Sequence, residues 1–549
     1  MNKTLILLLI LVASLLFRVT PPFIYGHPTI LDGWMHTYHA IDILKTGRIE
    51  MKMHYYMHWP LVNLVIAFSS LISGYDCFTS GSLIPPFIAS FTPLLLYLIV
   101  RRGVGDWRVG LVAAFILAFS GFHILVTGGT WKETLAHYLY KTVTLSLLLW
   151  FSRRDVKTSL VMILLFTGLV LDHHAISLIE LALIGFLLLN LFIADWYMGG
   201  LSVSDLIKAS ILYVVLVVIA LYYYYTHAVL FAIVPALTFD TLIRFLSYAF
   251  IFTLISIHTT IKGHNSRLLS VALLLIWFWG FLGWLAFVTG YPLFYGLLEN
   301  APQWAMVLLF PYVIVGFFAT RVVRALRDVG IKGRAFMFGY ASVIATLMAF
   351  VFFSGAMGAP PNFGLAYRLS SFFLVALSIV VGPYIAVLLS RLWRARKGKV
   401  ISAIICVCII LLCLPAVFGH YLGVLAFGYF NIYDRVEVHA YKWIHWHVDN
   451  IYSIAGDYRV TYAIGAHSMY YLGNYKSEVD FINTLSAKRL HGFKGFIINS
   501  RMVRDGFMPS YPVWIRLNYE NIRRLDSCLV GVGRVYVCGC GEVRLYYLL

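Results

Sequence analysis

Side chains that could do chemistry gather in a few polar stretches of an otherwise apolar chain. In "ILDGWMHTYHAIDILKTG", residues 30–47, Asp32, His36 and His39 are separated by four, three and seven positions. This spacing places all three on one face of a helix, where a carboxylate could act as a general base with imidazoles beside it. The same spacing is typical of an amphipathic helix that lies on a membrane surface. Spacing alone favours this second interpretation.

A second polar stretch is "GGTWKETLAHYLYK", residues 128–141. Glu133, His137 and Lys141 recur every four residues and share one helix face, with Lys141 about two turns deeper than Glu133. A lysine at membrane depth needs a partner or a water-filled cavity. Lys141 therefore either binds an anionic headgroup, forms an internal ion pair, or extends toward the surface.

Two further acidic or imidazole-bearing stretches follow. "DHHA" ends a predicted helix and carries Asp172, His173 and His174. Adjacent residues on a helix diverge by roughly 100°, so the two histidines are not expected to share a metal ion. Glu299 lies in the loop "YGLLENAPQW", where an isolated glutamate is usually solvated.

Arg368 stands at the start of "YRLSSFFLVALSIVVG", at the end of a predicted membrane helix. A planar, permanently charged guanidinium at that depth suits a phosphate or pyrophosphate group. The alternative is an ion pair with an acid such as Asp32 or Glu299.

Apolar side chains dominate the elements that must position these groups. Of the 549 residues, 61% are hydrophobic and only 12% are charged. A soluble protein could not keep so much apolar surface from water, and many runs reach about 17–25 residues, which is enough to cross a bilayer. We therefore predict a polytopic α-helical membrane protein, with residues 21–81 as a broken, amphipathic first external loop. The candidate spans are residues 4–20, 82–100, 108–127, 134–151, 158–171, 176–194, 210–226, 243–261, 268–289, 303–320, 337–353, 369–390 and 400–418.

The basic residues predict the orientation of these spans. They cluster in alternate short loops, at residues 101–108, 153–157, 208, 262–267, 321–334 and 391–399. Such loops are expected on the cytoplasmic side, which puts the polar stretches and the C-terminus outside. Topology thus explains the net charge of +18 without a nucleic-acid partner. The first span is expected to be retained, because Arg18 and two prolines follow it instead of a small-residue cleavage site.

The composition changes near residue 420. We predict a membrane domain over 1–419 and an extracytoplasmic mixed α/β domain over 420–549, with a helix in residues 431–450 and strands near 458–464 and 531–549. The cysteines of this region have a poor zinc-binding spacing. A single disulfide from Cys528 to Cys538 or Cys540 is compatible with an external location.

In their order along the chain, these features resemble the GT-C class of membrane glycosyltransferases, most closely the catalytic subunits of archaeal and bacterial oligosaccharyltransferases. The resemblance covers most of residues 20–390 and implies thirteen spans with an external C-terminal domain. It implies that Asp32 is the catalytic carboxylate, that Glu133 is the second acid of an acid-x-acid motif, and that Glu299 and Arg368 are the family's loop glutamate and helix arginine.

Two features depart from the family pattern. Trp131 stands where the first acid of the acid-x-acid motif is expected, and the C-terminal WWDYG motif is absent. Asp32, Glu133 and Glu299 are then the available ligands for a Mn²⁺ or Mg²⁺ ion, fewer than a hard cation prefers.

The sequence therefore predicts an extracytoplasmic transferase that moves a sugar or oligosaccharide from a polyprenyl (pyro)phosphate donor to a protein, lipid or glycan acceptor. Arg368, with Lys141 or a metal, would stabilise the phosphate leaving group, and the five histidines at 36, 39, 137, 173 and 174 would support the site. One alternative is a transporter or flippase of a lipid-linked anionic glycan, which is expected to carry charges along several helix interiors and an internal repeat. Another is a structural membrane protein that displays the outer domain.

Overall fold

The structure is a computed structural model of the chain. It describes chiefly residues 2–28, 31–49, 55–227, 239–262, 328–356, 363–394 and 435–447, together with short strands in the C-terminal region. The helices in chain order are α1 (Lys3–Tyr25), α2 (Leu31–Thr46), the 3-10 helix η1 (Tyr55–His58), α3 (Leu61–Ser73), α4 (Cys77–Ala89), α5 (Thr92–Val104), α6 (Trp107–Phe119), α7 (Gly121–Thr127), α8 (Lys132–Arg153), α9 (Val156–Asp172), α10 (His174–Tyr197), α11 (Val203–Thr226), α12 (Phe239–Lys262), α16 (Ile331–Ala356), α17 (Phe363–Arg394) and α20 (Arg435–His447).

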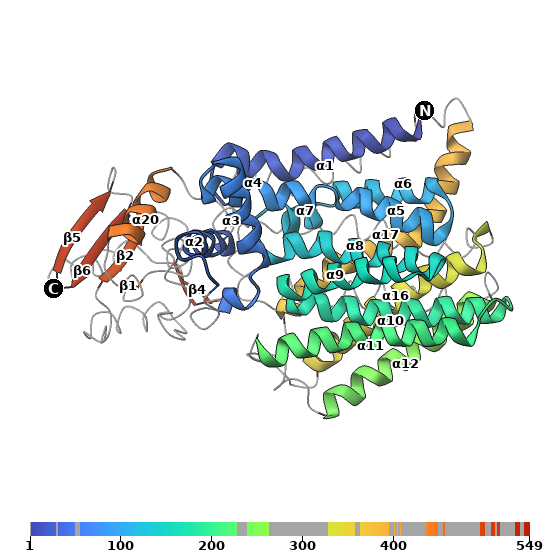
Figure 1. Ribbon diagram of the computed structural model, residues 1–549. Helices are drawn as coiled ribbons and strands as arrows, with labels where there is room; N and C mark the ends of the chain where they lie inside the picture. The colour runs from blue at the N-terminus through green and yellow to red at the C-terminus, as the bar shows by residue number, and fades with distance from the viewer. Residues whose placement is uncertain are drawn as a thin grey trace.

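Long apolar helices form a bundle in which the main core is built from α5, α6, α8–α11, α16 and α17 (Figure 1). Among the described residues, six helical segments are long and apolar enough to cross a membrane. They are Lys3–Ile24, Cys77–Val104, His174–Tyr197, Val203–Thr226, Ile243–Lys262 and Ser371–Trp393. The chain is therefore a multi-pass helical membrane protein, and the number thirteen stays a prediction.

Two predicted spans are broken in the structure. The span at 82–100 is α4 followed by α5, with Ser90 and Phe91 between them, and the span at 108–127 is α6 followed by the short α7. Pro93 in the first turn of α5 explains the first break, because proline cannot continue a preceding helix without losing a backbone hydrogen bond. Predicted spans at 268–289, 303–320 and 400–418 lie outside the described residues.

The two ends of the bundle differ in chemistry. At the end that is predicted to be cytoplasmic, Arg154 forms ion pairs with Asp195 and Asp205, and Lys332 lies 2.8 Å from Asp195. The opposite end carries α2, α3 and the first turn of α8 (Figure 1). Histidines, carboxylates and indoles are buried there, so this end is the candidate site.

The C-terminal region contributes α20 and six short strands. The strands are β1 (Ile454–Ala455), β2 (Gly495–Asn499), β3 (Phe507–Ser510), β4 (Val513–Ile515), β5 (Gly533–Cys538) and β6 (Val543–Leu548). Their order is β1-β2-β6-β5 in one sheet and β3-β4 in another, with β5 and β6 antiparallel. The predicted helix and the predicted strands near 531–549 are thus confirmed, whereas the strand expected near 458–464 and the Cys528 disulfide lie outside the described residues.

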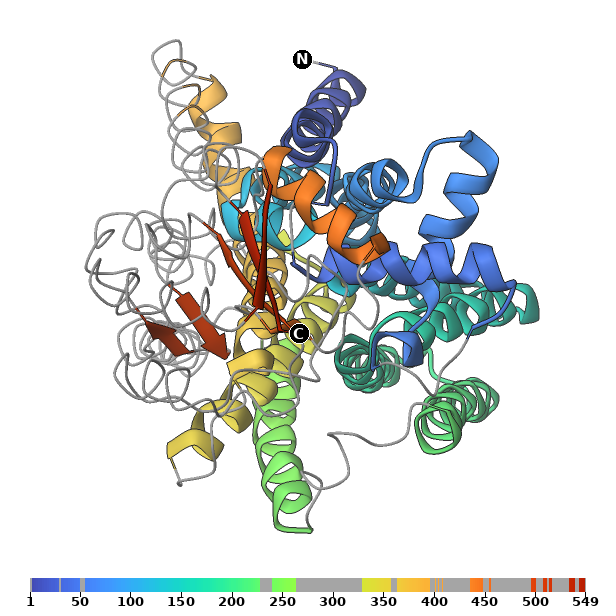
Figure 2. The same cartoon turned by 90° about the vertical axis from the view of Figure 1, so that its left-hand side faces the viewer.

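Helix α20 joins this region to the end of the bundle that carries α2. The His445 ring stacks on Tyr38 of α2 with centroids 3.8 Å apart, and the Lys442 ammonium lies 4.0 Å from the centroid of Phe78 in α4. Figure 2 looks onto this end, with α20 and the strands in front of the helix ends. Helix α20 therefore packs against the end of the bundle from which the candidate site is built.

Candidate active site

Helix α2 presents the first predicted carboxylate. It begins next to Asp32 and ends at Gly47, whose left-handed φ of +70° suits a residue without a side chain. Trp34, His36 and Tyr38 are buried, because α3, α4 and α20 cover the helix. The interpretation of this segment as a solvated helix on the membrane surface is therefore wrong, and Asp32 is a partly buried residue in the first turn of a buried helix.

A close backbone approach joins α2 to the loop before α8. A Cβ built on Gly33 would lie 2.9 Å from Thr130 Cβ and 2.7 Å from Pro28 Cβ, both too short for carbon atoms. Only glycine allows this contact. It brings the first turn of α2, which carries Asp32, against the residues that lead into Glu133.

Gly33→Ala is expected to destabilise the fold by about 1–3 kcal/mol, as overpacking of a tight contact typically does. A melting curve in detergent measures the loss. Gly168→Ala in α9 is the matched control, because its added Cβ would meet nothing closer than 3.9 Å. Equal melting temperatures for the two variants would show that the contact between Gly33 and Thr130 is not tight.

His36 extends the site inward from Asp32. Its Nδ1 donates to the Asn63 side-chain oxygen at 2.6 Å, and the ring lies within electrostatic range of Lys132 and Glu133. Burial, reinforced by the Lys132 charge, lowers the pKa of His36 to about 3. The ring is therefore neutral at physiological pH.

This pKa predicts a pH dependence of stability. The unfolded His36 binds a proton below about pH 6.5, whereas the folded ring resists protonation down to a pKa of about 3. The stabilisation is complete above pH 6.5 and is lost, at about 1.4 kcal/mol per pH unit, as the pH falls toward 3. Thermal unfolding between pH 7.5 and 4.5 should show a steeper decline for wild type than for His36→Asn. Parallel curves would contradict this assignment.

Glu133 occupies the first turn of α8 and is only 1% exposed. Its Oε1 lies 3.1 Å from Nε2 of His173, which begins the α9–α10 junction. The rings of His173 and His174 are 5.1 Å apart, and His174 contacts the Trp59 ring at 4.6 Å. The two histidine rings therefore stack on each other instead of diverging, because His173 lies before α10 with an extended backbone. His39 is also buried, and its Nδ1 lies 3.9 Å from a carboxylate oxygen of the exposed Asp42.

One turn deeper, His137 joins α8 to α17. Its Nε2 lies 3.0 Å from the Ser371 hydroxyl. Both helices begin at this end of the bundle, so Arg368, three residues before Ser371, lies on α17 near the level of Glu133, four residues before His137. The side chain of Arg368 and all of the loop that carries Glu299 lie outside the described residues.

Lys141 lies in the buried interior of the bundle. Its ammonium donates to the His137 carbonyl at 3.1 Å, lies 4.2 Å from the Tyr140 ring centroid, and has Glu180 as an electrostatic partner. Glu180 in turn accepts a hydrogen bond from Thr144. Among the described residues Lys141 forms no ion pair with Glu180, so the internal ion pair and the anionic headgroup both stay predictions for Lys141.

The sequence analysis did not identify Arg18 as part of a buried polar cluster. The side chain is fully buried in α1 and donates to Ser14, Thr127 and the Nδ1 atom of His123, each at 2.8 Å. The His123 ring lies 5.3 Å from that of His137. A lone arginine in an apolar run was the available signal, because such a residue is rare unless it has buried partners.

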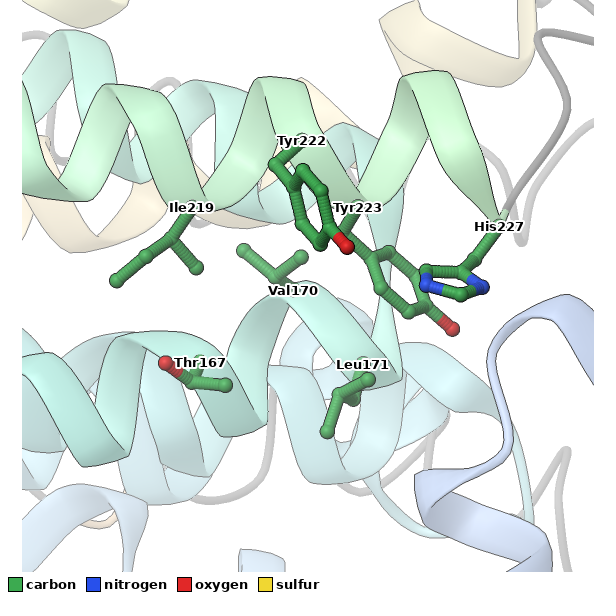
Figure 3. Close-up of a pocket in the computed structure, with 7 residues that line it drawn as sticks. All are labelled: Thr167, Val170, Leu171, Ile219, Tyr222, Tyr223 and His227. Atoms are coloured by element: carbon green, nitrogen blue, oxygen red, sulfur yellow. The ribbon is translucent and has the colours of Figure 1, made fainter.

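An apolar cavity of about 320 Å³ lies between α9 and α11 (Figure 3). It is lined by Thr167, Val170, Leu171, Ile219, Tyr222, Tyr223 and His227. The Tyr223 hydroxyl donates to the His58 carbonyl at 2.6 Å, next to the Trp59 ring that contacts His174. The cavity is therefore a near neighbour of the acidic site but separate from it.

The described residues fit a divalent cation only in part. Within the described ranges, no group of three or more His, Cys, Asp and Glu side chains is arranged to hold a metal ion. Glu133 supplies one buried carboxylate, and Asp172 supplies a second whose oxygens have no hydrogen-bond donor among the described residues. Carboxylates of this kind suit Mg²⁺ or Mn²⁺. Of the predicted ligand set, Glu299 lies outside the described residues.

Comparison with known proteins identifies the fold. No protein-family model matches the sequence, and no curated protein is similar to it. Solved structures that are similar in fold include the following three. The oligosaccharyltransferase of Archaeoglobus fulgidus in complex with Zn and sulfate has a TM-score of 0.53 at 13% identity, over 90% of this chain and 68% of that chain. The same organism's AglB with an inhibitory peptide and a dolichol-phosphate gives 0.53 at 14%, over 91% and 69%. ArnT from Cupriavidus metallidurans bound to undecaprenyl phosphate gives 0.50 at 12%, over 99% and 97%.

The chain thus has the fold of oligosaccharyltransferase-like membrane glycosyltransferases, as its resemblance to the GT-C class predicted. At 12–14% identity the similarity defines the fold and leaves the activity to be argued from the site.

Proposed function

We propose that this protein is an extracytoplasmic glycosyltransferase that takes its sugar from a polyprenyl phosphate or pyrophosphate donor. The proposal is supported by the positions of Asp32 and Glu133, whose helix ends lie close together at one end of a glycosyltransferase fold. Gly33 holds Asp32 against the loop before Glu133, and the His137–Ser371 contact sets the level of Arg368. The segments that carry Asp32, Glu133 and Arg368 are distant in sequence, and a purely structural protein has no need to bring them together.

The reaction that suits these groups is a displacement at the anomeric carbon. The acceptor nucleophile forms a bond to that carbon while the bond from the carbon to the phosphate oxygen breaks. Asp32 orients the acceptor and takes its proton. Arg368 stabilises the negative charge that develops on the departing polyprenyl phosphate. A bound divalent cation would add positive charge at the same place, and Glu133 would help to hold it.

The donor class has independent support. The similar structures are described with a dolichol-phosphate and with undecaprenyl phosphate, and one carries an acceptor peptide containing the NVT sequon. The apolar cavity between α9 and α11 lies beside the site, and its lining suits a short length of apolar chain. We further propose that residues 420–549 form an extracytoplasmic domain that borders the acceptor side, as the contact of α20 with α2 suggests.

The acceptor is the property to establish experimentally. Purified protein in nanodiscs would be incubated with a labelled polyprenyl-linked sugar pool, a sequon peptide and native lipids, with and without Mn²⁺. Label on the peptide assigns an oligosaccharyltransferase, whereas label on a lipid or small glycan assigns a chain-extending transferase. No transfer to any acceptor would overturn the proposal.

Buried charge favours one second candidate, a flippase for a lipid-linked anionic glycan. Arg18, Lys141 and Glu180 are fully buried inside the bundle, and charges in helix interiors often mark transport pathways. A flippase would move a glycolipid from the inner to the outer leaflet of a proteoliposome unchanged, and Asp32→Asn would not affect it. The transferase proposal predicts no such movement.

A further inference from the structure

Arg18 is a buried guanidinium whose hydrogen bonds hold it in one orientation. Its Nη1 donates to the Ser14 hydroxyl in α1, at 2.8 Å. Its Nε and Nη2 donate to α7, to the Thr127 hydroxyl and to Nδ1 of His123, also at 2.8 Å. Ser14 in turn donates to the Ser90 carbonyl, at the break between α4 and α5. Because the donors of a planar guanidinium are fixed relative to one another, Arg18 joins these three segments into one rigid unit.

The bond to His123 also fixes the proton of that ring. Arginine only donates, so Nδ1 of His123 accepts and the ring proton lies on Nε2. This Nε2 has no hydrogen-bond partner among the described residues. The His123 ring instead meets the ring of His137 in α8, with centroids 5.3 Å apart and planes at 74°. Arg18 therefore sets both the tautomer and the orientation of the ring against which His137 packs.

His137 carries the contact from this unit to α17. Its Nε2 lies 3.0 Å from the Ser371 hydroxyl, and its ring lies 5.4 Å from that of Phe372. Phe372 also stacks on Tyr140, one turn farther along α8, at 4.6 Å. Arg368 lies three residues before Ser371, about one turn nearer the start of α17. The start of α17 is therefore held by side chains that lead back to α7 and α1.

We propose that Arg18 is a positioning residue for Arg368. It acts through the successive contacts of His123, His137 and Ser371, which are all buried. Because a close-packed interior absorbs little displacement, a shift of the first ring is passed on to the helix that carries the arginine. The effect on sugar transfer rests on the proposed function, whereas the effect on the start of α17 does not.

Hydrogen–deuterium exchange, measured by mass spectrometry on the full-length protein in nanodiscs, tests the effect on α17. Arg18→Met keeps an apolar stem of similar length but donates no hydrogen bond to His123. Residues 363–371 should then exchange about 10-fold faster than in wild type, as expected for the loss of one buried hydrogen bond. Residues 380–390, farther along the same helix, should exchange as in wild type.

Arg334→Met is the matched control. Arg334 also donates to neighbouring groups, the carbonyls of Thr260 and Val329, but at the opposite end of the bundle. Its replacement should leave the exchange of residues 363–371 unchanged.

His137→Phe provides a second variant if Arg18→Met does not fold, because it keeps an aromatic ring but loses the contact with Ser371. It should also speed exchange at residues 363–371. Wild-type exchange there in every folded variant, or an equal increase at residues 380–390, would overturn the proposal.

A double-mutant cycle tests the effect on transfer. Arg18→Met should lower kcat about 10- to 100-fold, and more with a monophosphate donor than with a pyrophosphate donor. In the Arg368→Ala background the same change should alter kcat by no more than about twofold, because the group that Arg18 positions is gone. A merely structural role would lower kcat by the same factor in both backgrounds. Arg18→Lys should recover part of the rate, since an ammonium can still donate to some of the partners.

The two experiments separate this inference from the proposed function. Equal losses of kcat in both backgrounds would overturn the positioning role and leave the transferase function standing. Faster exchange at residues 363–371 in a protein that transfers no sugar would reject the transferase function and support the link from Arg18 to α17.

Discussion

Asp32→Asn is expected to lower kcat for sugar transfer about 100- to 10,000-fold, the usual range for loss of a general base. The amide has the same shape as the carboxylate but does not accept a proton from the acceptor. The KM for the donor should change little, because Arg368 and the lipid tail would still hold it. Steady-state kinetics with a lipid-linked donor in nanodiscs separate the two parameters.

Asp42→Asn is the matched control for this prediction. Asp42 lies on the same helix, but its side chain is 58% exposed, and among the ion pairs described it contacts only His39. Its replacement should leave kcat within about twofold of wild type. A fall in kcat of the same size for both variants would indicate damage to α2 and would not support a catalytic role for Asp32.

Arg368→Ala is expected to lower kcat about 100- to 1,000-fold, comparable to the loss of one group that stabilises a developing anion. The largest effect should fall on donors with the poorest leaving group, so a monophosphate donor should suffer more than a pyrophosphate donor. Arg368→Lys should recover part of the rate, because it restores the charge but not the two parallel hydrogen bonds of a guanidinium.

Arg391→Ala offers a control on the same helix. Arg391 is exposed near the opposite end of α17. It belongs to the basic cluster at 391–399, which is predicted to be cytoplasmic. Its removal should leave transfer unchanged. If Arg368→Ala changed KM for the acceptor and left the leaving-group dependence intact, the phosphate role would be wrong and an ion pair with an acid would be the better account.

The sequence predicts local structure well where apolar residues recur with the period of a helix or a strand. Helix α20 falls within the predicted stretch 431–450, and β5 and β6 lie within the predicted strand region 531–549 and pair antiparallel. These features depend on neighbouring residues only. The order of the acidic stretches likewise predicted the fold, which the similar structures confirm.

What the sequence does not predict is which elements cover one another. The spacing of Asp32, His36 and His39 is the same for a wet helix and for a buried one, and only the packing of α3, α4 and α20 decides between them. Asp172 was judged by its position next to two histidines. The packing of α8 against the α9–α10 junction, which places His173 3.1 Å from Glu133, is not visible in that local pattern.

The central claim is that the sugar comes from a polyprenyl phosphate or pyrophosphate donor. Proteoliposomes would be given the same labelled sugar either as a polyprenyl phosphate or as a nucleotide sugar, and label on acceptor would be measured for wild type and Asp32→Asn. We predict transfer by wild type from the polyprenyl phosphate alone, with release of the lipid phosphate and with at least a 100-fold lower rate for the variant. Transfer from the nucleotide sugar, or equal rates for wild type and variant, would contradict the account.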